Sequence, residues 1–497
     1  MLRSWKLNLE IDSGSDAPLF VRLSRAIVRD IERGRLSPGD ALPGTRALAQ
    51  RLGIHRNTVD AAYRELIQQG WASAEPSRGT FVSGTLPVKT PRGFGSAPRL
   101  RMPARPAFEL DGWEESLRDS SAPAPRGALL FNDGAPDVRL APAVELSRAF
   151  RRVLTGRART TLASGDPRGE PLLRRALARM LSETRGLAAG EDDVLVTRGS
   201  QMGLFLVARA LVRPGDVVAV ESLGYRPAWD ALRLAGAELV GLPVDGHGLK
   251  VEALQELLAR RPVRAVFVTP HHQYPTTVTL TAARRMELLR LAEGAGMAIV
   301  EDDYDHEFHY EGRPVLPLAS ADRSGSVIYV GSLSKLVAPG LRLGYVVAPA
   351  PVVRRLASLR AVVDRQGDAP LERAVAELLE EGELQRHARR ARREYEARRD
   401  VLAETLRTEL GGRVDFDVPA GGLALWARVR EELDVELWAE QAKQEGVLLT
   451  TGRAFALEGP GPRAFRLGHA SLTPTELREA VRRLARACPR GRKAPRT

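Results

Sequence analysis

The sequence predicts an α/β protein in which a small helical domain precedes a larger domain built on a mostly parallel sheet. Within residues 1–85, three short amphipathic segments are followed by the pattern of a hairpin. From about residue 126 onward, apolar strand-like runs alternate with helical patterns, which is typical of a parallel sheet covered by helices. Residues 86–125 lack periodicity and are rich in proline and basic side chains, so we expect a semi-extended linker there.

Composition and charge exclude several classes of protein. Of the 497 residues, 43% are hydrophobic, which allows large cores, and the net charge of +12 is compatible with nucleic acid or an anionic ligand. The single cysteine, Cys488, excludes a disulfide within one chain and a cysteine metal site. No apolar run reaches the roughly 20 residues of a membrane helix. Met1–Asn8 carry no apolar leader segment. We therefore expect a soluble, cytoplasmic protein with no membrane partner.

The N-terminal elements follow the plan of a winged helix-turn-helix. Apolar periodicity predicts helices over Pro18–Arg33, Thr45–Leu52 and His55–Gln69, with Thr45 as the cap of the second. Two strand candidates, Trp71–Glu75 and Gly79–Val82, surround a turn. In this plan the third helix enters the major groove of DNA. A small three-helix interaction domain with solvated polar residues would show the same periodicity.

Local motifs favour DNA binding. Leu42–Ala49, Arg56–Val59 and Gly79–Val82 resemble the DNA-binding domain of the GntR family, and the resemblance covers residues 18–82. Polar residues early in the third helix are of the types that contact phosphates and base edges, and an arginine at the wing tip could reach the backbone. Gly44 stands where the family usually has serine, so one phosphate-binding hydroxyl is missing. The expected DNA contacts are Arg46, Arg56, Asn57, Thr58, Arg78 and Gly79.

In the larger domain, Lys335 follows an apolar strand, Ser326–Val330. An amine in a partly dry cleft loses its proton more readily and becomes a nucleophile. Ser332 and Ser334 supply hydroxyls, and Arg342 supplies a fixed positive charge for phosphate. This combination suits an aldehyde cofactor that carries a phosphate. Taken alone, Lys335 is more simply interpreted as a solvated lysine in a polar loop.

Two further segments place polar groups at the ends of buried strands. The run Met297–Val300 leads into the acidic segment Glu301–Asp305, and carboxylates at the carboxyl end of a strand point into the ligand crevice of an open α/β sheet. One of them could pair with a protonated pyridine nitrogen. After the strand Val194–Thr197, residues Gly199–Gln201 are expected to open a helix whose backbone N–H groups bind phosphate.

The order of these motifs resembles that of the fold-type-I aminotransferases from about residue 126 onward: Thr197–Gln201, Gly224–Tyr225, Thr269–Thr276, Glu301–Tyr304 and Ser332–Lys335. The resemblance implies that Lys335 is the catalytic lysine, which forms an aldimine with pyridoxal 5'-phosphate. It implies that Asp302 keeps the pyridine nitrogen protonated, and that Arg466 grips the α-carboxylate of an effector. The cofactor-binding residues are then Lys335, Asp302, Tyr304, Tyr225, Ser332, Arg342, Gly199, Ser200 and Gln201.

Adjacent histidines suggest a metal site, but the sequence argues against it. No carboxylate or third histidine accompanies His271 and His272 at useful spacing, so we expect no metal and expect both, with Gln273, to line the cofactor crevice. Two departures from the aminotransferase pattern argue against efficient catalysis. Ser164 stands where relatives commonly have a tyrosine, and Tyr274–Thr277 replaces an Asn-Pro-Thr-Gly loop.

The whole chain resembles the MocR subfamily of transcriptional regulators, with domains expected at 1–85, 86–125 and 126–497. The resemblance implies a homodimer that binds a double-stranded DNA operator and senses an amino-acid-like effector through aldimine exchange at Lys335. The alternative is a working aminotransferase with an added DNA-binding domain. A regulator that has lost the cofactor is disfavoured because Lys335, Asp302 and Arg342 are all present.

Overall fold

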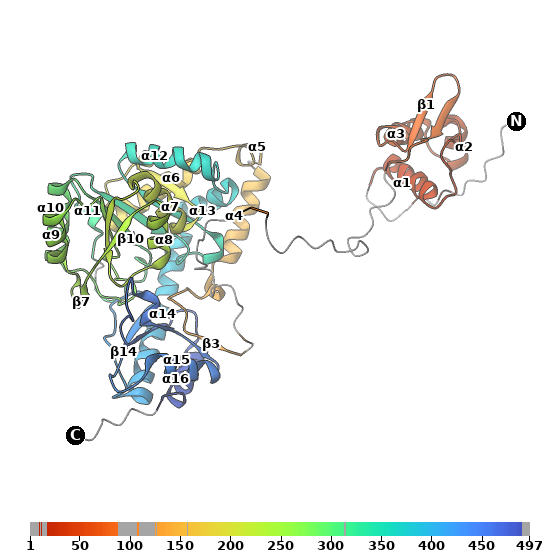
Figure 1. The fold of residues 1–497 in the computed structure, drawn as a ribbon. Coiled ribbons are helices and arrows are strands. Elements are labelled where there is room, and N and C mark those ends of the chain that lie inside the picture. Colours follow the sequence, from red (N-terminus) through yellow and green to blue (C-terminus); the bar gives the residue numbers. More distant parts are fainter. Residues whose placement is uncertain are drawn as a thin grey trace, which may run out of the picture. The chain divides into compact units, whose positions relative to one another are not determined.

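The computed structural model describes residues 9, 11, 17–87, 107–108, 125, 127–156, 158–312 and 315–489 (Figure 1). The chain divides into two compact units, Met1–Ser116 and Leu117–Thr497. Most of the expected linker, 86–125, lies outside the described residues. Among the residues that are described, no helix is both long and apolar enough to cross a membrane.

The first unit contains three helices and a hairpin: α1 (Leu19–Glu32), α2 (Thr45–Leu52), α3 (Arg56–Gln68), β1 (Ala72–Glu75) and β2 (Gly79–Val82). Leu23, Val59 and Leu66 are fully buried in its core. The expected cap of α2 was wrong, because Gly44 is the capping residue. The Thr45 hydroxyl instead accepts a hydrogen bond from Arg56 Nε at 3.3 Å. This bond joins the first turns of α2 and α3.

The second unit is built on a seven-stranded sheet with the order β4-β12-β11-β10-β9-β5-β6. Only β12 runs antiparallel to its neighbours, so the predicted mostly parallel sheet is confirmed. Asp302 on β10 pairs in register with Val330 on β11, which places the carboxyl ends of the two strands side by side. The strands are β4 (Val194–Thr197), β5 (Val217–Glu221), β6 (Glu238–Leu242), β9 (Ala265–Val268), β10 (Ala298–Asp303), β11 (Val327–Ser332) and β12 (Gly344–Val347).

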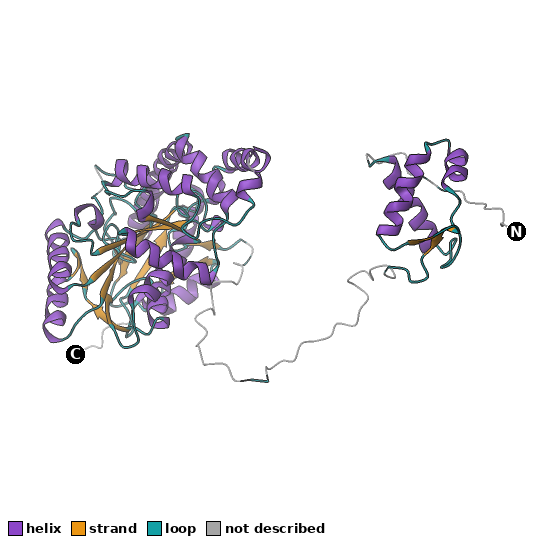
Figure 2. Cartoon of the chain, turned by 90° about the horizontal axis from the view of Figure 1, so that it is seen from above, coloured by secondary structure: helices purple, strands orange, loops and turns teal. Residues whose placement is uncertain are grey.

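Helices cover both faces of this sheet, as Figure 2 shows. Successive strand residues alternate between the faces: Val196 packs in the core beneath α6 and α13, and Leu195 packs in the core beneath α7, α8 and α12. The helices are α4 (Ala143–Gly156), α5 (Ala158–Thr161), α6 (Pro171–Arg185), α7 (Gly199–Leu211), α8 (Arg226–Leu234), α9 (Val251–Arg260), α10 (Ala282–Ala295), α11 (Leu318–Ala321), α12 (Ala350–Val363) and α13 (Ala369–Glu380).

A smaller C-terminal domain packs around a four-stranded antiparallel sheet with the order β13-β14-β17-β16. Helix α14 (Glu383–Leu410) belongs to both domains, because Leu384 is buried in a core of the large sheet and Leu406 in the core of the small domain. The other elements here are β3 (Leu129–Leu130), β13 (Val414–Asp415), β14 (Ala424–Val429), α15 (Val435–Gln444), β15 (Val447–Leu448), β16 (Thr450–Thr451), β17 (Ala464–Gly468) and α16 (Pro474–Arg486).

Candidate functional site

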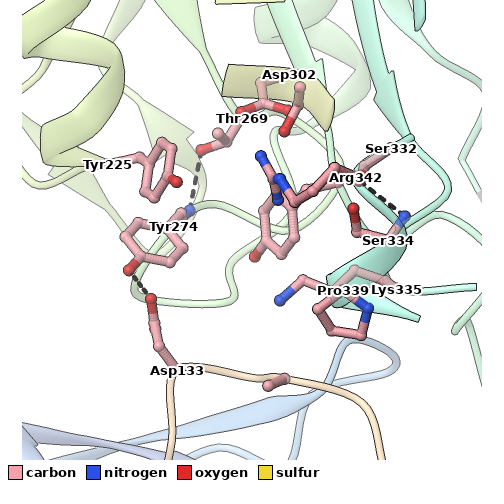
Figure 3. A pocket seen from close by; sticks show the side chains of 13 residues that line it. Asp133, Tyr225, Thr269, Tyr274, Asp302, Ser332, Ser334, Lys335, Pro339 and Arg342 are labelled. Carbon is pink, nitrogen blue, oxygen red and sulfur yellow. Dashed lines mark hydrogen bonds between the residues drawn. The ribbon is translucent and has the colours of Figure 1, made fainter. Parts of the chain in front are cut away.

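A cavity of about 240 Å³ lies where β10 and β11 end (Figure 3). Because both strands run in the same direction, their carboxyl ends and following loops meet at one edge of the sheet. Most of the expected cofactor residues line the cavity, namely Ser200, Tyr225, Asp302, Tyr304, Ser332, Lys335 and Arg342. Residues outside the expected cofactor-binding set also line it: Asp133, Ala135, Thr269, Tyr274, Ser334 and Pro339.

Lys335 reaches the cavity from the loop after β11. Its Nζ donates a hydrogen bond to the carbonyl oxygen of Gly134 at 2.8 Å. Desolvation lowers the pKa of this amine, and the negative charges of Asp133 and Asp305 oppose that change. A lysine with a lowered pKa is more often neutral, and the neutral amine is the form that attacks a carbonyl group.

Asp302 is the buried carboxylate of the cavity, with a relative exposure of 5%. Its Oδ1 has no hydrogen-bond partner within the described part of the chain. Burial raises its pKa to about 8, with further contributions from the negative charges of Asp303 and Asp305, while Lys335 acts in the opposite direction. A buried carboxylate without a partner favours a cationic ligand group, and a protonated pyridine nitrogen fits this requirement.

The other end of the cavity is suited to a phosphate. Gly199 begins α7 with a φ of +76°, and a Cβ atom at this position would lie only 2.5 Å from Nη2 of Arg342. The missing side chain therefore lets a guanidinium approach the start of a helix, where backbone N–H groups favour anions. Ser332 Oγ accepts a hydrogen bond from the backbone N–H of Ser334 at 3.1 Å. Gln201 lies elsewhere, because its side chain donates to the carbonyl oxygen of Pro227.

Three aromatic rings form one wall of the cavity. The ring of Tyr274 meets that of Tyr225 edge-on, with centroids 5.5 Å apart, and that of Tyr304, with centroids 6.0 Å apart. The Tyr304 hydroxyl donates to the carbonyl oxygen of His272 at 3.0 Å. Flat apolar surfaces of this kind suit a planar heterocycle. The residues present therefore fit pyridoxal phosphate at its ring, its ring nitrogen and its phosphate.

Arg466 lies on β17 of the small domain and is fully buried. Its Nε donates to Asp133 Oδ1 at 2.6 Å, and its Nη1 donates to the carbonyl oxygen of Pro275 at 2.5 Å. The hydroxyl of Tyr274 donates to the second carboxylate oxygen of Asp133. Asp133 is thus a site residue that the sequence analysis missed. The turn-forming run Asn132-Asp133-Gly134 was its only local signal.

The histidines do not line the cavity as expected. Gln273 is also absent from its wall, and its Nε2 donates to the carbonyl oxygen of Leu223. The argument that no third histidine accompanies the pair was wrong: a ligand atom from each of His271, His272 and His309 lies within 4.8 Å of the other two. Burial lowers the pKa of His271 to about 2, so its imidazole is neutral.

In the first unit, the expected DNA contacts form two groups. Arg46 is exposed in the first turn of α2, and Arg56 and Asn57 are exposed in the first turn of α3 beside the half-buried Thr58. Arg78 and Gly79 lie in the β1–β2 hairpin, where Arg78 forms an ion pair with Glu75 at 2.5 Å.

Comparisons with known proteins identify both units. Residues 20–82 match the family of bacterial regulatory proteins called gntR, and residues 129–484 match aminotransferase class I and II. The probable rhizopine catabolism regulatory protein MocR of Rhizobium meliloti is 32% identical over 492 residues, which cover 96% of this chain and 95% of that protein. The HTH-type transcriptional regulator TauR of Rhodobacter capsulatus is 34% identical over 485 residues, which cover 95% and 97%.

Similar solved structures cover the second unit. LysN, an α-aminoadipate aminotransferase from Thermus thermophilus complexed with N-(5'-phosphopyridoxyl)-L-leucine, has a TM-score of 0.68 at 30% identity, covering 73% of this chain and 92% of that one. A multiple substrate aminotransferase from Thermococcus profundus has a TM-score of 0.69 at 29% identity, covering 77% and 95%. An aminotransferase domain of this class implies pyridoxal phosphate as cofactor. The chain therefore belongs to the MocR-type GntR transcriptional regulators, in which a DNA-binding helix-turn-helix domain precedes an aminotransferase-like domain.

Proposed function

We propose that this regulator holds pyridoxal phosphate on Lys335 and senses an amino-acid-like effector, whose amine replaces Lys335 on the cofactor and thereby alters DNA binding. The observation that carries the proposal is the position of the Lys335 amine, which lies 2.8 Å from the Gly134 carbonyl oxygen in the same cavity as the unpaired Asp302 carboxylate. A nucleophilic amine and a carboxylate for the ring nitrogen are the two groups that this cofactor requires.

Each residue of the cavity has a separate task. The cofactor supplies an aldehyde that condenses reversibly with amines. Asp302 keeps a proton on the ring nitrogen, since a buried carboxylate is most stable next to a cation. Arg342 and the N-terminus of α7 at Ser200 hold the phosphate. Tyr225 and Tyr304, which both line the cavity, would supply flat surfaces for the ring.

The effector would be recognised through its carboxylate. The buried guanidinium of Arg466 lies over the aromatic wall, with its Cζ 4.6 Å from the centroid of the Tyr274 ring. In the structure Asp133 occupies one side of this guanidinium. An effector carboxylate would take the place of Asp133 and form the bidentate pair that arginine favours.

The same contact offers a route from effector to DNA. Lys335 follows β11 of the large sheet, whereas Arg466 belongs to β17 of the small domain. An effector bound by both its amine and its carboxylate therefore bridges the two domains, and a ligand shifts a conformational equilibrium only through such differential contacts. Closure of the small domain would then alter how the DNA-binding units engage the operator.

A homodimer would present two DNA-binding units and so requires two operator half-sites, direct or inverted. Apolar side chains at the surface support self-association. Leu162 and Val362 are 67% and 87% exposed. Their segments are held together by a hydrogen bond from the Gly165 N–H to the Gln366 side chain. Exposed apolar side chains that gather in one place mark protein interfaces.

A second candidate function is transamination, with the DNA-binding domain as an addition. The observation that favours it is the joint presence of Lys335 and Asp302 in one cavity, with Arg466 bonded to Asp133 of the cavity wall, together with the aminotransferases among the similar structures. A steady-state assay with amino acids and 2-oxoglutarate separates the two. Sustained turnover supports the enzyme, and a spectral change without turnover supports the sensor.

The central test uses absorbance and footprinting on the full-length protein. Wild type should show a visible cofactor band that borohydride fixes onto Lys335, and a candidate amino acid should shift the band and change the footprint. Lys335→Ala should bind cofactor without covalent fixation at this site. Lys250→Ala serves as a control, since Lys250 is an exposed lysine that is absent from the cavity. A borohydride-stable adduct at this site in Lys335→Ala contradicts the proposal.

A further inference from the structure

A histidine cluster lies between the loops that follow β9 and β10, apart from the residues that line the cofactor cavity. His271 and His272 follow the end of β9, and His309 follows the end of β10. The two strands are parallel neighbours, so these loops leave the same edge of the sheet. One ring nitrogen from each histidine lies within 4.8 Å of the other two.

The nitrogens of this cluster are buried without hydrogen-bond partners. His271 and His272 are 3% and 2% exposed. Within the described part of the chain, neither nitrogen of His271, nor Nε2 of His272, nor Nδ1 of His309 has a partner. Buried polar atoms are nearly always paired, so a concentration of unpaired nitrogens at one point requires an explanation.

The environment of His272 supplies a second, independent observation. Its Nδ1 lies 2.8 Å from Oδ1 of Asp305, which is 1% exposed. A carboxylate in this position holds the proton on Nδ1 and leaves the lone pair of Nε2 free on the opposite side of the ring. Metal-binding histidines characteristically donate their other ring N–H to such a carboxylate.

We propose that His271, His272 and His309 bind a divalent transition-metal ion, with Zn²⁺ as the ion best suited to the donor set. Imidazole nitrogens suit zinc, copper and nickel, whereas magnesium and calcium prefer oxygen ligands. Tetrahedral zinc with bonds of about 2.0–2.1 Å needs ligand atoms about 3.3 Å apart. In the structure the ligand nitrogens lie within 4.8 Å of one another. Each distance between two nitrogens would therefore have to shorten by about 1.5 Å at most, which side-chain rotation can achieve.

The site has a route from solvent and a further histidine beside it. His309 is half-buried and lines a second cavity of about 240 Å³, together with Glu307 and residues of α14. An ion could enter through this cavity, with a water as its remaining ligand. His306 packs against His271 with ring centroids 4.7 Å apart, and its Nδ1 lies 3.0 Å from Asp303 Oδ2, although neither of its ring nitrogens forms a hydrogen bond within the described residues.

A bound ion would join segments that border the cofactor cavity. The carbonyl oxygen of His272 accepts a hydrogen bond from the hydroxyl of Tyr304, which lines that cavity. His309 forms an isolated β-bridge with Gly421. The metal would therefore cross-link the two strand-end loops beneath one wall of the cavity.

Cobalt titration tests the site directly. The full-length protein, free of any histidine tag, is stripped with a chelator and titrated with Co²⁺ while its visible spectrum is recorded. We expect one equivalent per chain to give ligand-field bands at wavelengths longer than those of the cofactor, and Zn²⁺ to displace it. If no saturable cobalt spectrum forms in the wild-type protein, the proposal is wrong, whatever the variants do.

Variants assign the ligands. Asp305→Asn removes the carboxylate that orients His272 and should lower the affinity for Co²⁺ and Zn²⁺ by roughly 10- to 100-fold. His309→Ala removes the least buried ligand itself, so its affinity should fall further than that of Asp305→Asn. His247→Ala, in the exposed turn between β7 (Val244–Asp245) and β8 (Gly248–Leu249), should leave the affinity unchanged. Circular dichroism checks that each variant is folded, and His272→Gln replaces His309→Ala if the latter is not. Unchanged binding in either folded variant identifies adsorption at other sites and overturns the proposal.

Discussion

Arg466 is held by Asp133: Nε of the guanidinium lies 2.6 Å from Oδ1 of the carboxylate, although 332 residues separate them along the chain. The two residues differ in exposure, since the Arg466 side chain is 1% exposed and that of Asp133 is 41% exposed. The exposed carboxylate is the replaceable partner of a buried cation. A carboxylate that enters from solvent would therefore compete with Asp133 for Arg466.

Replacing Arg466 with alanine should strongly weaken the effector response while cofactor absorbance and basal DNA binding persist. The loss of a charge-assisted pair to a buried guanidinium costs about 2–5 kcal/mol, so the effector concentration that alters the footprint should rise at least ~30-fold. Arg466→Lys keeps the charge without the bidentate fork and should give an intermediate result. An effector titration followed by footprinting measures this. An unaltered response in Arg466→Ala would remove Arg466 from the coupling.

Replacing Asp133 with asparagine should instead increase effector affinity. The substitution removes the carboxylate that competes for Arg466 but retains a side chain of similar size. Because Asp133 is partly exposed, the gain should be limited to about 1 kcal/mol, or roughly fivefold. Spectral titration of the cofactor band measures it. Asp417→Asn is the control. Asp417 is an exposed carboxylate of the small domain that pairs with Arg428, so its loss should leave the effector affinity unchanged. Weaker binding in Asp133→Asn would indicate that Asp133 holds the effector rather than competing with it.

Three buried carboxyl groups should lower the stability of the cofactor-free protein as the pH rises from about 4 to about 8. Up to about pH 6.5 the buried His271 and His469 act in the opposite direction, because their pKa values are lowered to about 2 and about 3, so the net stability should fall above about pH 6.5. Burial raises the pKa of Asp302 from 3.8 to about 8 and those of Glu221 and Glu301 from 4.5 to about 7. In this window the folded state retains protons that the unfolded state has lost, so each carboxyl group lowers the unfolding free energy by up to about 1.4 kcal/mol per pH unit. Below about pH 4 the contribution is fully present.

The variant Asp302→Asn tests the contribution of Asp302 to stability at the upper end of this pH range. Between pH 7 and 8 the variant should lose less stability than wild type, because Glu221 and Glu301 have already ionised and only Asp302 still retains its proton. Glu221→Gln should flatten the curve only below about pH 7. Urea unfolding at a series of pH values provides the measurement. Parallel curves for Asp302→Asn and wild type above pH 7 would contradict the raised pKa.

Replacing Arg56 with alanine should weaken operator binding by about 1–3 kcal/mol if its guanidinium reads a guanine. Arg64→Ala is the matched control, since Arg64 lies later on the same helix and is paired with Asp60 at 2.6 Å. Wild-type binding should also decline steeply with salt, because phosphate contacts release counterions. Gel-shift titrations across a range of salt concentrations separate the two effects. Equal losses in both variants would show that Arg56 contributes only its charge.

The sequence predicted those parts of the molecule that depend on local patterns. Apolar periodicity predicted the ends of α1, α2 and α3 to within two residues. Because the carboxyl ends of parallel strands meet at one edge of a sheet, the sequence also predicted that Asp302 and Lys335 lie close together. What it missed depends on distant pairings. Asp133 becomes a site residue only when the segment before α4 folds against β17, and His309 meets His271 only when two loops converge. Neither contact leaves a periodic signal in the chain.

Helix α14 has a consequence for how the protein unfolds. Its 28 residues span about 42 Å, and its side chains belong at one end to the core of the large sheet and at the other to the core of the small domain. Neither core can melt without exposing part of the same helix, so the large and small domains should denature in one cooperative transition. The N-terminal unit has a core of its own and shares no element with them. On heating, the DNA-binding unit and the cofactor unit should therefore behave as two calorimetric domains.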